Sequence, residues 1–124
     1  MRRIIPILAA LLALTGPQGK AADELVAPTQ QQLIELLSGN SMEGIWARRP
    51  YLQYFAADGS TRYREQGGEE NEGLWRVNEQ GQYCSRWPPS ERWVCYDALV
   101  SGNNIYWKSG GEFYPAEVKP GKFF

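Results

Sequence analysis

Histidine is missing from this chain, and cysteine occurs only twice. Without an imidazole, Ser-His-Asp and Cys-His catalysis, histidine-ligated zinc and the usual proton shuttle at neutral pH are excluded. Two cysteines alone do not complete a structural zinc site either. The sequence also shows no nucleophile motif. We therefore expect no catalytic residue, no metal site, no cofactor and no enzymatic activity.

Long apolar runs are scarce as well. The one at residues 4–14 follows Arg2 and Arg3 and is too short to cross a bilayer, which takes about 20 apolar residues. This pattern is typical of a secretory signal peptide. We predict that residues 1–21 are removed after Ala21, that the protein has no stable membrane span, and that it resides in the periplasm or is secreted. The alternative is an uncleaved N-terminal anchor.

Basic residues are in slight deficit. The chain has 13 basic and 14 acidic residues, and three of the basic ones lie within residues 1–21. Removal of that segment leaves ten basic and 14 acidic side chains, a net charge of −4. Because affinity for nucleic acids comes mainly from clustered Lys and Arg, we expect no nucleic-acid partner.

One helix is expected near the start of the mature chain. In residues 29–40, Thr29 is a suitable N-cap, Gln32 occupies the capping-box position and Gly39 can supply a left-handed stop. We predict that the apolar face of this helix covers an open end or a flank of the domain; the alternative is a helix that binds a partner. That face consists of Leu33, Ile34, Leu36 and Leu37.

From Met42 onward, short β-prone runs alternate with turn residues about every ten positions, which is typical of an antiparallel all-β domain. Closing such a sheet removes its exposed edges. We predict a small eight-stranded antiparallel meander barrel over residues 42–124, preceded by a leader and a short helix over residues 22–41; a two-sheet sandwich is the alternative. The expected strands are residues 42–48, 51–56, 60–66, 73–78, 82–87, 91–99, 104–108 and 112–118. The expected turns are Arg49-Pro50, Asp58-Gly59, Gly67-Gly68, Gln80-Gly81, Pro88-Pro89, Gly102-Asn103 and Gly110-Gly111.

The stretch YCSRWPPSERWVCY, residues 83–96, predicts a hairpin about the Pro-Pro pair. Opposite residues of an antiparallel pair lie close enough for a disulfide, and export provides oxidising conditions. We predict a structural disulfide between Cys84 and Cys95 rather than a redox pair, which would favour C-x-x-C spacing. The resulting register pairs Tyr83 with Tyr96, Ser85 with Val94, Arg86 with Trp93 and Trp87 with Arg92, and it lays the guanidinium of Arg86 over the ring of Trp93.

Aromatic side chains recur in strand after strand, with five Trp, seven Tyr and four Phe. Many of these rings fill the core of a small barrel. Adjacent rings such as Tyr106 and Trp107 must point to opposite faces of a strand, so some lie outside the core and are available to a ligand. The predicted ligand-binding set is Trp46, Trp75, Tyr83, Trp93, Tyr96 and Trp107.

Residues 65–73 bring together four glutamates and several glycines. A calcium-binding loop needs ligands at fixed alternating offsets, and that pattern is missing. We therefore expect a solvated loop over these residues rather than a metal site. The four glutamates are Glu65, Glu69, Glu70 and Glu72.

Six motifs lie along the mature chain, and the resemblance that they carry extends over nearly all of it: LSGNSMEG, YFAADG, GLWRV, QYCSRW, CY and IYW. Together they resemble a family of small exported proteins of unknown function, found mainly in alphaproteobacteria. The resemblance implies an eight-strand, barrel-like domain with one disulfide and implies no activity. The turn Gly39-Asn40-Ser41 stands where the family has Gly-Asn-Thr, a departure that keeps a hydroxyl. In shape alone, eight-stranded meanders are also similar to lipocalins, avidins and secreted protease inhibitors.

These features favour a non-enzymatic binding module of the cell envelope, in which the mouth of the barrel or an aromatic face holds a small apolar or aromatic ligand. The alternative is an inhibitor or interaction protein that blocks a secreted hydrolase with a rigid loop at residues 87–90. The expected partner is therefore a small ligand or an envelope protein.

Overall fold

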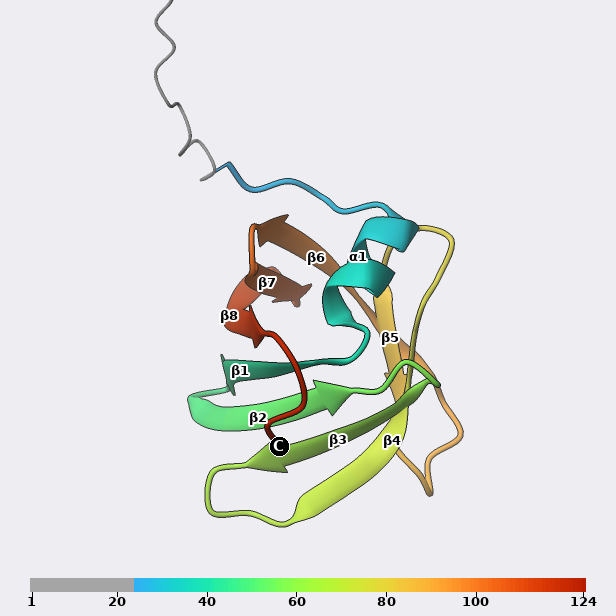
Figure 1. Ribbon diagram of the computed structural model, residues 1–124, viewed down its shortest axis with the longest axis vertical. Coiled ribbons are helices and arrows are strands. Elements are labelled where there is room, and N and C mark those ends of the chain that lie inside the picture. The colour runs from blue at the N-terminus through green and yellow to red at the C-terminus, as the bar shows by residue number, and fades with distance from the viewer. Residues whose placement is uncertain (1–23) are drawn as a thin grey trace, which may run out of the picture.

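The computed structural model describes residues 24–124, so the predicted signal peptide lies outside the described residues. One helix precedes eight strands, which pair antiparallel in chain order and close into a barrel (Figure 1). This arrangement confirms the predicted fold class and excludes the sandwich. The elements are α1 (Gln30–Leu37), β1 (Asn40–Trp46), β2 (Arg49–Phe55), β3 (Ser60–Glu65), β4 (Glu70–Val77), β5 (Tyr83–Arg86), β6 (Val94–Ser101), β7 (Asn104–Ser109) and β8 (Glu112–Lys119).

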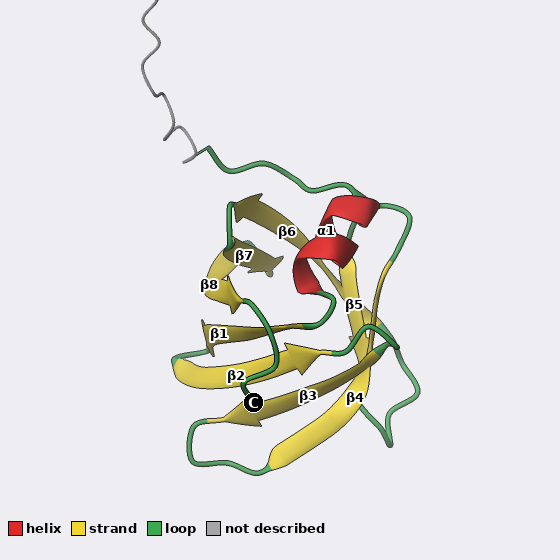
Figure 2. Cartoon of the chain, in the orientation of Figure 1, coloured by secondary structure: helices red, strands yellow, loops and turns green. Residues whose placement is uncertain are grey.

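The barrel closes where β1 pairs with β8, from Ser41 opposite Lys119 to Gly44 opposite Ala116. Because successive strands run in opposite directions, the turns collect at two ends. The turns after β2, β4 and β6 lie at the end occupied by α1 (Figure 2). The turns after β1, β3, β5 and β7 lie at the other end, which we call the open end; they are residues 47–48, 66–69, 87–93 and 110–111.

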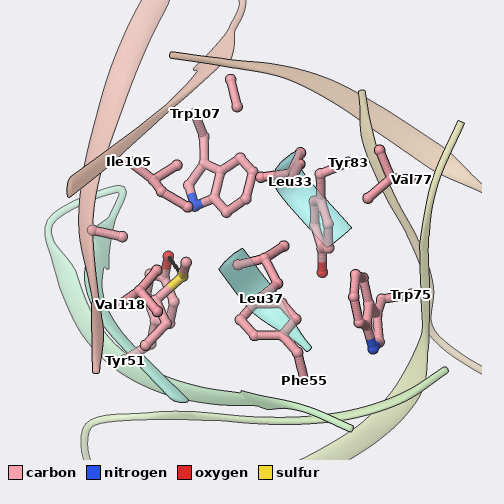
Figure 3. Packing of buried hydrophobic residues seen from close by; sticks show 13 residues of the cluster. Leu33, Leu37, Tyr51, Phe55, Trp75, Val77, Tyr83, Ile105, Trp107 and Val118 are labelled. Atoms are coloured by element: carbon pink, nitrogen blue, oxygen red, sulfur yellow. Dashed lines mark hydrogen bonds between the residues drawn. The ribbon is translucent and has the colours of Figure 1, made fainter. Parts of the chain in front are cut away.

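Helix α1 closes its end of the barrel. The Thr29 hydroxyl oxygen accepts a hydrogen bond from the Gln32 amide at 3.1 Å, and the Gln32 side-chain oxygen accepts one from the Thr29 amide at 3.0 Å, which confirms the predicted capping box. Leu33 and Leu37 are fully buried and point into the barrel (Figure 3). The helix therefore covers an open end, as predicted. No helix in the described part of the chain is long and apolar enough to cross a bilayer.

The densest part of the core lies beneath α1. Inward-facing side chains of the strands surround Leu33 and Leu37, and the ring of Phe55 meets Trp75 edge to face at 5.5 Å (Figure 3). The burial of this apolar surface is the main favourable contribution to folding. The cluster consists of Leu33, Leu37, Met42, Tyr51, Phe55, Trp75, Val77, Tyr83, Ala98, Ile105, Trp107, Ala116 and Val118.

The predicted turn at Arg49-Pro50 is wrong. Arg49 pairs with Trp46 and Pro50 pairs with Ile45, so both belong to β2. The turn is formed instead by Ala47 and Arg48, whose φ angles are +53° and +71°. Two consecutive positive φ angles match the twist of a two-residue hairpin, although Ala and Arg are not the residues that usually adopt them. Proline tolerates the extended backbone of a strand end, where its missing N–H costs little.

The predicted loop over residues 65–73 is also longer than the observed one. Glu65 ends β3, and β4 begins at Glu70, which pairs with Arg64; the next residue, Asn71, pairs with Tyr63. An ion pair of 2.8 Å between Arg62 and Glu70 supports this extra pairing. The turn is therefore confined to residues 66–69, and the glutamates gather around the open end.

The predicted hairpin register is confirmed where the strands pair. Cys84 lies opposite Cys95 and is joined to it by a disulfide, with Tyr83 opposite Tyr96 on one side. The predicted pairs beyond Ser85 are not formed, because β6 begins at Val94 and residues 87–93 form a wider loop.

The predicted contact of a guanidinium with Trp93 is present on the outer wall next to this disulfide. The Arg86 guanidinium lies 5.6 Å from the centroid of the Trp93 ring. Arg76, which the sequence analysis missed, lies closer at 3.9 Å. Both arginines are thus directed to the outside of the barrel.

The C-terminal residues cross the outer wall of β1, β2 and β3 (Figure 1). The Ser41 hydroxyl donates to the Gly121 carbonyl at 2.8 Å and accepts from the Phe123 amide at 3.1 Å. The ring of Phe124 lies 4.8 Å from the Arg64 guanidinium and 5.2 Å from that of Arg62. The tail therefore covers polar strand positions and engages the basic residues of β3 outside the barrel.

Candidate ligand-binding cavity

A cavity of about 480 Å³ opens at the end of the barrel opposite α1. It forms because inward-facing residues near the open end are rings set against the wall, whereas the aliphatic side chains of α1 fill only the other end. Seven aromatic residues line it, together with two buried polar side chains from its floor. The lining residues are Trp46, Tyr51, Gln53, Tyr63, Glu70, Asn71, Glu72, Tyr83, Ser85, Trp87, Pro88, Tyr96 and Trp107.

One wall of the cavity is a row of three rings from β2, β3 and the loop after β5. Tyr51 stacks on Tyr63 with a centroid distance of 5.0 Å. Tyr63 in turn meets Trp87 edge to face at 5.8 Å. Contacts of this geometry add stability beyond the area that the rings bury, so each ring holds its neighbour in place.

Two further groups complete the wall. Trp46 stacks on Tyr114 at 4.2 Å and meets the ring of Tyr96 edge to face at 5.4 Å. The rings of Tyr83 and Trp107, both drawn in Figure 3, are tilted relative to each other with centroids 4.8 Å apart. Both residues line the cavity. The rings that bound the cavity are therefore held in place by contacts with other rings.

Two glycines make room for this wall. A Cβ at Gly44 would lie within 2.7 Å of three atoms of the Tyr51 side chain, and a Cβ at Gly73 would lie 2.6 Å from the Trp87 indole. No real Cβ approaches its neighbours this closely, so any larger residue would displace the ring. Gly44 and Gly73 are thus required by the packing of the cavity wall.

The floor of the cavity is polar and internally hydrogen-bonded. Gln53, which is 6% exposed, donates from its side-chain nitrogen to the Thr61 hydroxyl at 2.9 Å and to the Tyr83 hydroxyl at 3.1 Å. The Trp87 indole nitrogen donates to the Ser85 hydroxyl at 3.1 Å. Buried polar groups that are satisfied in this way fix the orientation of the side chains around them.

Burial raises the pKa of four tyrosines of the cavity. It raises the pKa of Tyr63 from 10.0 to about 12, and the neighbouring Glu65 carboxylate, 3.3 Å from the Tyr63 hydroxyl, adds to the shift. It raises the pKa of Tyr51, Tyr83 and Tyr96 above their ordinary value as well. The phenol form of each ring is therefore favoured by folding.

This shift predicts a loss of stability at alkaline pH. Because the pKa of Tyr63 is higher in the folded than in the unfolded state, its contribution is fully present below pH 10 and is lost as the pH rises toward 12. We expect urea unfolding midpoints to fall over this interval, together with delayed phenolate absorbance in the folded protein. Phenolate formation by all tyrosines with a common midpoint near pH 10 in folded protein would contradict this result.

The structure brings together four of the six aromatic residues predicted to bind a ligand. Trp46, Tyr83, Tyr96 and Trp107 all line the cavity. Trp75 lies at the α1 end, where its indole nitrogen donates to the Ala56 carbonyl at 2.9 Å. Trp93 lies on the outer wall beneath two arginines. Neither Trp75 nor Trp93 is among the residues that line the cavity.

Other residues of the lining were not among those predicted to bind a ligand, chiefly Tyr51, Gln53, Tyr63 and Trp87. The alternation of a strand carries a usable signal, because Phe55 is a core residue and Tyr51 and Gln53 precede it on the same face. This signal can be used only if it is already known which face of β2 points into the barrel. Trp87 carries no such signal, since it lies in a loop.

A second hollow, of about 600 Å³, lies over the ends of β2 and β3 and the turn between β3 and β4. Its lining has only one aromatic side chain, Tyr51, and includes the exposed Arg64. It has neither the ring wall nor the hydrogen-bonded polar floor of the cavity at the open end. The cavity is therefore the better candidate for a ligand site.

No protein-family model matches this chain, and no curated protein sequence matches it. The resemblance to a family of small exported proteins thus stays a prediction, while the barrel fold and the disulfide rest on the structure itself. Among residues 24–124, no group of three or more His, Cys, Asp or Glu side chains is placed to hold a metal ion.

Proposed function

We propose that this protein is a non-enzymatic binding module that holds a small apolar or aromatic ligand in the cavity at the open end of the barrel. The observation that carries the proposal is the cavity itself: about 480 Å³, lined by seven aromatic residues and closed below by packed side chains. Sites for small ligands are usually concave, mostly apolar and furnished with a few polar groups. Gln53 and Ser85 are such groups here.

Export to the periplasm or beyond the cell belongs to the same proposal. The disulfide between Cys84 and Cys95 supports it, because disulfides persist in oxidising compartments and are rare in the cytosol. Mass spectrometry of the protein recovered from its native host tests it directly. Recovery from the periplasm or medium with a chain that begins after Ala21 is expected; recovery from the cytosol with both thiols reduced would contradict export.

The geometry favours ligand binding over inhibition by the loop at residues 87–90. An inhibitory loop presents its large side chain outward to fill a pocket of the enzyme. Trp87 instead faces inward, over Gly73 and against Tyr63. Its ring is therefore part of the cavity wall.

Binding can be measured with N-phenyl-1-naphthylamine, a neutral dye whose emission rises in apolar surroundings. We expect saturable enhancement with wild-type protein. Ser85→Phe places a ring inside the cavity, because Ser85 is a 5% exposed lining residue, and we expect dye affinity to fall at least about tenfold.

The control is Leu99→Phe, which places the same side chain on the outer face of β6, since its neighbour Ala98 faces the core. This variant should bind the dye as the wild-type protein does. Equal dye binding by Ser85→Phe and wild type would show that the dye does not occupy the cavity and would contradict the proposal.

A further inference from the structure

We infer that the cavity selects ligands by charge and prefers an organic cation, such as a compound in which a methylated ammonium group is attached to an apolar or aromatic body. The inference rests on the proposed function and names the class of ligand. Three independent observations support it: the ring faces, the hydrogen-bond donors of the lining, and the distribution of charged residues around the barrel.

The first observation is the number of aromatic faces. Rings from six strands and one loop surround a single space, so a compact cation inside it contacts several π-faces at once. The negative face of an aromatic ring attracts a cation, most strongly for Trp. Trp46, Trp87 and Trp107 all line the cavity. A cage of this kind is the usual means of recognising methylated ammonium groups.

The second observation is that most hydrogen-bond donors of the lining are already engaged within the protein. Gln53 donates from its side-chain nitrogen to Thr61 and to Tyr83. The group of this amide that is left for a ligand is the side-chain oxygen, which accepts hydrogen bonds and donates none. The Trp87 indole donates to Ser85. The Tyr51 hydroxyl donates to the sulfur of a neighbouring methionine at 3.5 Å. An anion needs donors to replace its hydration, and this lining offers few.

The third observation is the position of the charges. No Lys or Arg of residues 24–124 lines the cavity, whereas Glu70 and Glu72 do. Glu65 lies beside them at the open end and accepts a hydrogen bond from Tyr63. Arg62 forms an ion pair with Glu70 and Arg49 forms one with Glu65, so the uncompensated carboxylates of residues 65–73 are those of Glu69 and Glu72. Carboxylates at the mouth of a low-dielectric cavity attract cations and repel anions.

Four arginines of the strands around the cavity are engaged elsewhere. Arg62 forms an ion pair with Glu70 at 2.8 Å, and Arg64 lies against Phe124 on the outer wall. Arg76 and Arg86 both lie against Trp93, again outside the barrel. An anionic ligand inside the cavity would therefore meet no positive partner, and burying an unpaired anion is costly.

The test compares three probes that share a phenyl ring with a compact tetrahedral group: phenyltrimethylammonium, the neutral tert-butylbenzene and the anionic benzenesulfonate. Each is titrated against the wild-type protein loaded with N-phenyl-1-naphthylamine, and the apparent Kd is taken from dye displacement. We expect phenyltrimethylammonium to bind about tenfold more tightly than tert-butylbenzene. Benzenesulfonate should not displace the dye at concentrations where the other two displace all of it.

The outcomes separate the inference from the proposed function. If tert-butylbenzene binds as tightly as phenyltrimethylammonium or more tightly, or if benzenesulfonate binds best, the preference for cations is wrong while a small-molecule site stands. If neither the dye nor any of the three probes binds, the proposed function itself is wrong.

A substitution tests the role of the rings. In Trp46→Leu an apolar group replaces a π-face. We therefore expect the affinity for phenyltrimethylammonium, relative to that for tert-butylbenzene, to fall about threefold while tert-butylbenzene still binds. Binding of tert-butylbenzene also reports that the variant is folded; if it is lost, Tyr96→Leu serves in its place. The control Trp93→Leu removes a Trp from the outer wall and should leave the ratio unchanged. An unchanged ratio in the cavity variant would contradict the inference.

Discussion

The double variant Cys84→Ala/Cys95→Ala is expected to unfold with a free energy about 3 kcal/mol lower than that of the wild-type protein. The bond joins two residues eleven positions apart, so its loss frees a loop of the unfolded chain that the bond had restricted. It also joins β5 to β6, the neighbouring strands with the shortest ladder: three register pairs, on a strand of four residues. The barrel is thus most dependent on covalent support at this pair.

Urea unfolding with and without a reducing agent measures this contribution. Reduction should lower the stability of the wild-type protein to that of the double variant and leave the variant unchanged. Alanine is used rather than serine because Cys84 is 1% exposed, and a buried hydroxyl would add a cost of its own. A difference below about 1 kcal/mol would show that the strands hold together without the bond.

Leu37→Ala is expected to lower the free energy of unfolding by about 3 kcal/mol. Leu37 is fully buried where α1 enters the barrel, and its truncation leaves a cavity that surrounding strands cannot easily close (Figure 3). The matched control is Leu36→Ala on the same helix, because Leu36 is only partly buried. Its loss should cost no more than about 1 kcal/mol.

The comparison of the two variants distinguishes a helix that completes the core from one that merely rests on the barrel. Equal and small losses in Leu36→Ala and Leu37→Ala would contradict the packing described for α1. Dye binding should persist in both folded variants, since the helix lies at the end of the barrel opposite the cavity. Loss of dye binding in folded Leu36→Ala protein would indicate a ligand site at the helix instead.

Local features of the sequence were sufficient for much of the fold. The capping box of Thr29 and Gln32 depends on contacts between residues three positions apart, and it occurs as predicted. The pairing of Tyr83 with Tyr96 follows from the disulfide, because one covalent link fixes the register of both strands. Short turns between successive strands predict an antiparallel meander, and the removal of exposed edges favours its closure into a barrel.

The features that could not be predicted depend on contacts between strands distant in the sequence. Trp87 leaves the hairpin because Gly73, on β4, leaves space for its indole. Trp75 and Trp107 each lie within a predicted strand, and the sequence does not distinguish them. Their positions along the barrel axis place Trp75 beneath α1 and Trp107 beside the cavity. A cavity at one end depends on which inward positions α1 fills, and no local pattern encodes that.

The most direct test of a ligand site at the open end uses the five tryptophans as internal reporters. Each indole N–H gives one signal in the nitrogen-15 correlation spectrum, and single substitutions assign them. On addition of tert-butylbenzene, the signals of Trp46, Trp87 and Trp107 should shift with one common Kd, while those of Trp75 and Trp93 stay in place. Shifts confined to Trp75 or Trp93, or no shift of any indole signal, would contradict a ligand site among the rings of the open end.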